Sequence, residues 1–165
     1  MTNANDRDAT HILAADHREV ERLFAAFDKA GDSAKKQAIA EQICTELKIH
    51  SQIEEEIFYP ALDGKIDDDL LKEAYVEHDG AKVLINEIVE GGPDEAFYDA
   101  KVTVLKEQIE HHVEEEEKIR GNMFQQARAA GVDLEAIGDQ LLARKQELKT
   151  LAETEGLPPA ELATM

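Results

Sequence analysis

Four histidines and two glutamates of this chain have the types and the spacing of metal ligands. The candidate ligands are His17, His50, Glu54, His78, His112 and Glu116. His50 lies four residues before Glu54, and His112 lies four residues before Glu116. Because residues i and i+4 lie on one side of a helix, each pair can offer a nitrogen to one metal ion and a carboxylate oxygen to a bridge between two.

The apolar residues around these six side chains place them on the inward faces of helices. Leu13, His17 and Val20 follow one another in steps of four and three, and similar steps run through the series that contain the other five. Burying unpaired carboxylates costs several kcal/mol each, so cations are a simpler solution than a hydrogen-bonded histidine network in a plain acidic bundle. Six ligands exceed the four of a zinc site, and mixed imidazole and carboxylate ligation suits two iron or manganese ions.

The order of the ligands indicates a duplicated helix pair, with a lone histidine on one helix and a His-Glu pair on the next. The interval from His17 to His78 nearly equals that from Glu54 to Glu116. His111 competes for the inward position in the last segment, but its stripe is largely polar, and we interpret His112 as the inward residue. No histidine follows a glutamate by three residues, which excludes the ExxH pattern of ferritin-like bundles.

Four long amphipathic segments carry these ligands and stop at glycine, proline or turn residues. The segments cover about residues 10–30, 33–62, 67–90 and a fourth from about residue 94 that loosens near Gly121. Short loops between helices of this length predict an all-α fold, an up-down-up-down four-helix bundle. We place this bundle in residues 9–130.

A fifth amphipathic helix is expected in residues 131–165, which form the second predicted unit. Asp133 is its candidate N-cap, and leucines and an isoleucine form its apolar stripe. This helix either packs on the bundle or mediates a homodimer. Residues 156–159, with two prolines, are expected to form a loose tail.

The charge balance limits the classes of partner. The chain has 37 acidic and 18 basic residues and a net charge of −19, which argues against nucleic-acid or anionic membrane partners. A single cysteine excludes a disulfide framework, and no apolar run is long enough for a membrane span. The first residues contain no apolar stretch of a secretory signal, so a cytoplasmic location is expected.

The ordered motifs make the sequence similar to the hemerythrin-like (HHE cation-binding) family. The matching runs are Asp16-His17, His50 to Pro60, Glu77-His78 and His112 to Glu117. The resemblance implies a non-haem di-iron centre, bridged by Glu54, Glu116 and an oxo or hydroxo group, that binds oxygen, peroxide or nitric oxide in oxygen, redox or iron stress. The alternative is a metal-binding sensor or iron store without turnover that acts through a conformational or oligomeric change.

Two positions depart from the family pattern. Lys82 stands where oxygen-carrying hemerythrins have a further histidine, so one metal ion lacks a nitrogen ligand, and Glu77, Glu21 or a water molecule are the candidates to replace it. The chain after Glu116 carries extra residues, which predicts a π-bulge or a break near Gly121.

Overall fold

The computed structural model describes residues 7–165, and its regular structure is entirely helical, as predicted. The α-helices are α1 (Ala9–Lys29), α2 (Ser33–Ile53), α3 (Tyr59–Leu62), α4 (Asp68–Gly91), α5 (Tyr98–Val113), α6 (Met123–Ala129) and α7 (Leu134–Thr154). Two π-helical segments, η2 (Glu54–Phe58) and η3 (Glu114–Lys118), follow α2 and α5 directly. No helix in residues 7–165 is both long and apolar enough to cross a membrane.

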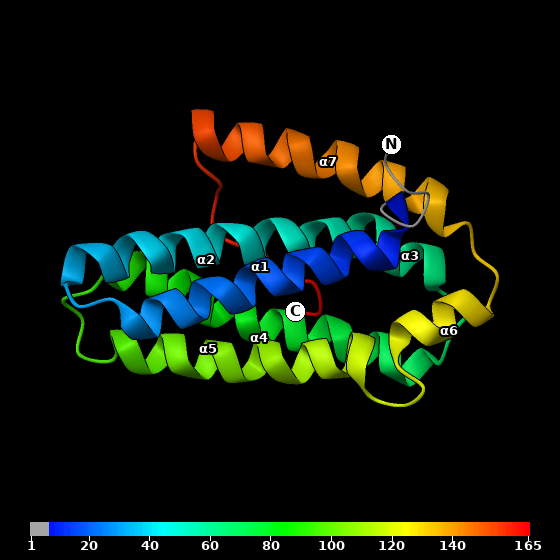
Figure 1. Cartoon of the computed structure of the whole chain (residues 1–165), viewed down its shortest axis with the longest axis horizontal. Helices are drawn as coiled ribbons and strands as arrows, with labels where there is room; N and C mark the ends of the chain where they lie inside the picture. The colour runs from blue at the N-terminus through cyan, green and yellow to red at the C-terminus, as the bar shows by residue number, and fades with distance from the viewer. Residues whose placement is uncertain (1–6) are drawn as a thin grey trace.

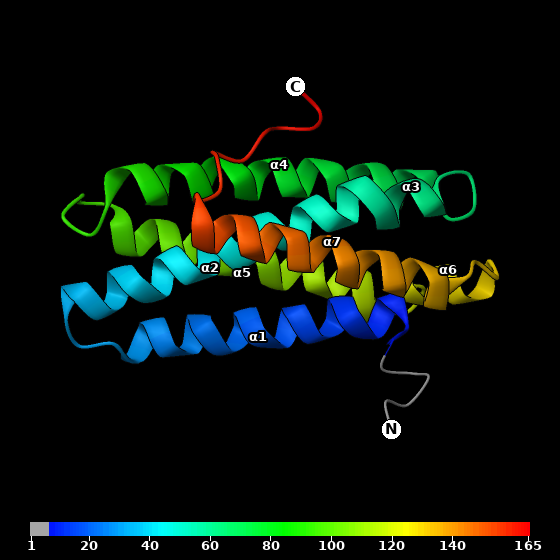
Figure 2. The same cartoon turned by 90° about the horizontal axis from the view of Figure 1, so that it is seen from above.

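The four long helices α1, α2, α4 and α5 lie side by side and are joined in sequence at alternating ends (Figures 1 and 2). The seventh helix, α7, lies outside this group and contacts α1 and α2. Gly138 allows a close approach there, because a Cβ atom at this position would lie 1.7 Å from the backbone oxygen of Arg7.

Side-chain caps start most of the helices. An aspartate precedes α1, α2, α4 and α7, and its carboxylate accepts a hydrogen bond from a backbone N–H of the first turn. Asn122 caps α6 in the same way. Each such cap stabilises a helix by about 1 kcal/mol, so these residues fix where the elements begin.

The candidate ligands divide the apolar core into two clusters. Along α1, Leu13 belongs to one cluster and Val20 to the other, and His17 lies between them. Along α4, His78 separates Ala74 from Ala81 in the same way. The polar residues therefore occupy a layer with apolar packing on both sides, which keeps water away from them.

Three boundaries differ from the expected segments. The helix predicted for residues 33–62 changes to π-helix at Glu54, and the fourth segment does so at Glu114. The fourth segment then breaks at Ile119, whose backbone is extended, and turns at Gly121, whose φ is 75°. Both alternatives predicted after Glu116 are thus present, whereas the π-helix after α2 was not expected.

The expectation of a loose C-terminal tail is wrong. The tail, residues 155–165, has no regular secondary structure, but it lies against α2 and α4. Asp79 accepts hydrogen bonds from the backbone N–H groups of Ala163 and Thr164, at 2.7 and 2.8 Å. Asn86 forms a pair of hydrogen bonds with the backbone of Ala160. These side chains attach the backbone of the tail to α4.

Candidate metal centre

All six predicted ligands meet in the polar layer between the two apolar clusters. Each of them is buried: His17, His50, Glu54, His78, His112 and Glu116. The histidines form two pairs, with 3.2 Å between the Nε2 atoms of His17 and His50 and 3.2 Å between those of His78 and His112. Oε1 of Glu54 lies between the pairs, 2.9 Å from Nε2 of His50 and 3.2 Å from Nε2 of His78.

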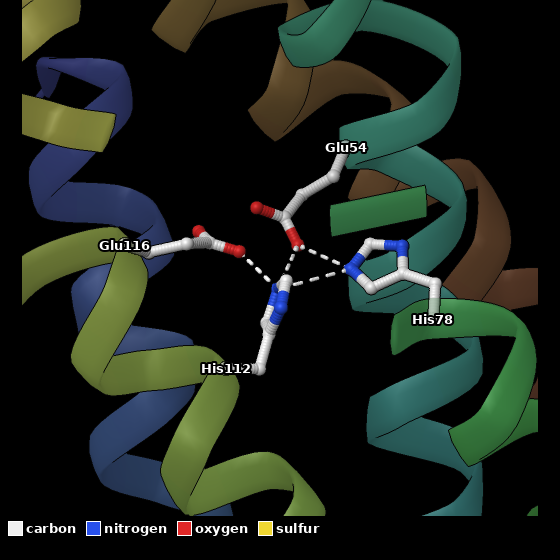
Figure 3. Close-up of side chains that lie close together, drawn as sticks. All are labelled: Glu54, His78, His112 and Glu116. Carbon is white, nitrogen blue, oxygen red and sulfur yellow. Dashed lines mark hydrogen bonds and ion pairs between the residues drawn. The ribbon is translucent and has the colours of Figure 1, made fainter. Parts of the chain in front are cut away.

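Figure 3 shows how four elements supply one side of this centre. Glu54 comes from η2, His78 from α4, and His112 and Glu116 from α5 and η3, and all four side chains point toward one another. One ligand atom from each of these residues lies within 4.8 Å of the others, which is the arrangement of a metal site.

A ring of four carboxylates surrounds the histidines. Each carboxylate accepts a hydrogen bond from the Nδ1–H of a histidine on the next helix. The pairs are His50 with Asp16 (2.9 Å), His78 with Glu55 (2.8 Å), His112 with Glu77 (2.9 Å) and His17 with Glu117 (3.3 Å). Every one of these carboxylates is next in sequence to a candidate ligand of its own helix, so the contacts link the four helices in a closed circle. Carboxylate partners of this kind orient histidine ligands of metals.

Basic side chains complete the ring on its outer side. Asp16 pairs with Lys145 of α7, Glu55 with Lys82, Glu117 with Arg18, and Glu77 with His111. Each histidine is therefore the inner end of a chain that runs from a base through a carboxylate to the centre.

This ring fixes which groups face the centre. Because the four Nδ1 atoms donate to carboxylates, the Nε2 atoms point inward, and two facing Nε2 atoms at 3.2 Å repel each other unless a proton or a metal ion lies between them. Both carboxylate oxygens of Glu54 and Oε2 of Glu116 are buried without a hydrogen-bond partner. Unpaired buried oxygens are rare in proteins, and here cations would satisfy them together with the imidazole lone pairs. The donor set therefore fits a metal centre.

In the metal-free centre, neighbouring histidines have very different pKa values. Burial lowers the pKa of His17 to about 4. Burial also acts against the charged form of His50, but the negative charge of Glu54 outweighs it and raises the pKa of His50 to about 10. Desolvation disfavours charge on Glu54 too, yet the neighbouring His50 keeps the pKa of Glu54 well below its ordinary value. The centre thus retains a carboxylate charge and attracts a proton or a metal ion.

Tyr59 is a residue of this centre that the sequence pattern does not reveal. Its hydroxyl donates to Oε1 of Glu116 at 3.0 Å and lies 3.1 Å from Nε2 of His78. In an α-helix, Tyr59 would point about 140° away from Glu54, since each residue turns the chain by about 100°. The π-turn of η2 instead joins the Tyr59 N–H to the Glu54 carbonyl and brings both side chains to the centre.

The position of the missing histidine is not filled by the residues proposed for it. Lys82 points its Nζ to Oε1 of Glu55 at 2.8 Å. Glu77 faces outward from the centre, with one oxygen on Nδ1 of His112 and the other on His111. Glu21 lies on the surface beside Arg18 and Lys118. The remaining candidates to replace the missing histidine are a water molecule and the hydroxyl of Tyr59.

The two remaining histidines lie outside the centre. The side chain of His11 is 52% exposed and that of His111 is 63% exposed. His111 forms a separate group with Glu77 and Glu115 on the outer face of α4 and α5. The apolar stripe therefore selected the inward residue of the His111-His112 pair.

A small cavity adjoins the histidines on the side of the second apolar cluster. Its volume is about 30 Å³, and residues from all four long helices line it, among them Val20, Leu47, Ala81 and Ile109. A space of this size holds one or two molecules as small as water. An open coordination position that faces this cavity would admit only small ligands.

Comparisons with known proteins agree with this geometry. The family model of the hemerythrin HHE cation binding domain matches residues 8–124. A DNA nickase of Nostoc sp. (strain PCC 7120) is 27% identical over 127 residues, which are 74% of this chain but only 36% of that protein. The crystal structure of an HHE cation binding domain-containing protein from Mycobacterium kansasii shares the fold, with a TM-score of 0.71, 23% identity, and 91% of this chain and 94% of that chain covered. This chain belongs to the hemerythrin HHE cation-binding domain family.

Proposed function

We propose that this chain holds two iron ions and binds a small oxidant, which is oxygen, peroxide or nitric oxide. In this proposal His17 and His50 would hold one ion, His78 and His112 would hold the other, and Glu54 and Glu116 would offer carboxylate oxygens to both. The supporting observation is the carboxylate ring, which turns the Nε2 atoms of four histidines toward the buried oxygens of Glu54 and Glu116.

The residues around the centre have separate tasks in this proposal. When bound, iron supplies an open coordination position and a change of redox state. The apolar walls of the small cavity exclude bulk water from that position. Burial and the nearby carboxylates raise the pKa of Tyr59, so its hydroxyl keeps a proton that it can donate to Glu116 or to a ligand beside it.

The cellular role that we propose is a response to oxygen, redox or iron stress in the cytoplasm. The nickase relative is almost three times as long as the matched part, so its named activity is not transferred to this chain. With a net charge of −19, we expect neither nucleic-acid nor membrane binding.

A metal sensor or iron store without turnover is the second candidate, and one contact favours it. Lys145 of α7 pairs with Asp16, which in turn holds His50. In this second candidate, a metal ion in the centre changes the contacts of α7 and thereby the tendency of the chain to form a homodimer through α7. Hydrogen exchange of α7 that is identical in metal-free and iron-loaded protein, together with an unchanged sedimentation coefficient, would argue against this candidate.

Elemental analysis with absorption spectroscopy tests the first candidate. We expect about two irons per chain after anaerobic loading, and a spectral change on adding oxygen, peroxide or nitric oxide. His50→Ala and Glu116→Ala should lose most of the iron, whereas His11→Ala, a matched change of an exposed histidine, should keep it. A fully loaded protein that responds to none of the three oxidants would refute the oxidant-binding role.

A further inference from the structure

A second, larger cavity lies directly outside the centre. Its volume is about 370 Å³, and its walls come from α2, η2 and residues 157–161 of the tail. The small inner cavity and this outer cavity share two lining residues, Ser51 and Lys82. The two spaces therefore meet at these side chains, and a molecule that passed between them would go from solvent to the histidines.

Lys82 is fixed in the partition by three groups. Its side chain is buried, and its ammonium donates hydrogen bonds of 2.8 Å both to Oε1 of Glu55 and to the backbone oxygen of Glu161 in the tail. The carboxylate of Asp79 lies 3.6 Å away. A buried ammonium keeps such oxygen partners because losing them leaves an uncompensated charge. The tail thus supplies one of the groups that hold Lys82 in place.

The tail itself is held mainly by hydrogen bonds and only little by apolar packing. Asp79 and Asn86 bind its backbone, and Lys48 donates to the carbonyl oxygen of Pro158 at 3.2 Å. The tail has no helix of its own and contributes little to the apolar clusters, in which Leu157 is its only member among the described residues. A segment with these contacts opens at a much lower free energy than the packed helices.

We propose that small uncharged molecules enter the metal centre through the outer cavity, and that Lys82, held by the C-terminal tail, closes this entrance. Three glutamates, Glu55, Glu56 and Glu161, and two lysines, Lys48 and Lys82, line the outer cavity, and this excess of one negative charge disfavours the passage of anions. The kind of molecule that enters rests on the proposed function, but the position of the entrance does not. The entrance itself can be tested without iron.

A cysteine placed inside the small cavity reports on the entrance. Ala81 lines only the inner cavity, so Ala81→Cys in a Cys44→Ser background gives one thiol to react with the small uncharged reagent methyl methanethiosulfonate. We expect labelling to be at least tenfold faster in Lys82→Ala and in a chain that ends at Glu155. Lys36→Ala removes the same charge from an exposed ion pair of α2 and should leave the rate unchanged.

Further variants and a second assay separate the outcomes. Asp79→Asn keeps the tail but weakens its attachment, so it serves if the shortened chain does not fold, and faster labelling is expected there too. Equal labelling rates in all variants would overturn the proposal, and so would an equal increase in Lys36→Ala, which would indicate general loosening. Nitric oxide association with the iron-loaded variants should accelerate in parallel. Failure of nitric oxide to bind at all would count against the proposed function, while labelling would still decide the entrance.

Discussion

Asp16→Asn tests whether the carboxylate ring prepares the histidines for metal. The change keeps the size of the side chain but removes the charge that accepts from Nδ1 of His50 at 2.9 Å and pairs with Lys145. Although burial opposes its ionisation, the hydrogen bond from His50 and the charge of Lys145 keep the pKa of Asp16 below its ordinary value, so the wild type holds a carboxylate at neutral pH. Removing one such outer partner weakens metal binding by about 10- to 100-fold.

That loss corresponds to about 1.4 to 2.8 kcal/mol for the ion held by His50. The assay is competition for Fe²⁺ or Zn²⁺ against a chelator of known affinity, followed for both bound ions. Only one of the two binding steps should weaken, because the other three ring contacts stay intact. Glu19→Gln, a charge removal on the exposed face of α1, should leave both affinities unchanged. Unchanged affinities in Asp16→Asn, with unchanged thermal stability, would show that the ring does not tune the metal.

Three further outcomes are expected. The metal-free protein should be most stable near pH 6.5, and thermal unfolding across pH measures this. Because the pKa of His17 is lowered to about 4 in the folded protein, stability is lost as the pH falls from about 6.5 toward 4. Because the pKa of His50 is raised to about 10, stability is lost as the pH rises from about 6.5 toward 10. Tyr59→Phe should lower stability by about 1.5 to 3 kcal/mol, because the hydroxyl donates to a buried carboxylate, and should alter the absorption spectrum of the iron-loaded protein. An unchanged spectrum would place the hydroxyl outside the metal's influence. Gly138→Ala should destabilise by about 1 to 3 kcal/mol in urea unfolding because a backbone oxygen lies 1.7 Å from the added carbon, whereas Gly31→Ala, with open space around it, should not.

Helical periodicity predicted the parts of the site that lie within regular α-helix. The steps of three and four identified His17 and His78, and they chose His112 over His111 correctly with respect to burial. Tyr59 was missed because a π-turn separates it from Glu54 and breaks the period on which the prediction depends.

The ring and the tail were missed for a different reason. Glu55 and Glu117 look like ordinary surface acids in the sequence, because their role depends on a histidine of a neighbouring helix. The tail is attached by bonds from Asp79 and Asn86 to backbone atoms, and no side-chain pattern in residues 160–164 records these bonds. Contacts between distant segments of this kind follow only from the assembled fold.

The outer bases make the two halves of the centre electronically unequal. The carboxylates behind His17 and His50 face permanent cations, Arg18 and Lys145. Behind the other pair, Glu55 faces the ammonium of Lys82, but Glu77 faces the exposed imidazole of His111, which is a cation only when it is protonated. A cation draws electron density from its carboxylate and makes the attached imidazole a weaker donor. A metal ion held by His17 and His50 would therefore have weaker imidazole donors than one held by His78 and His112.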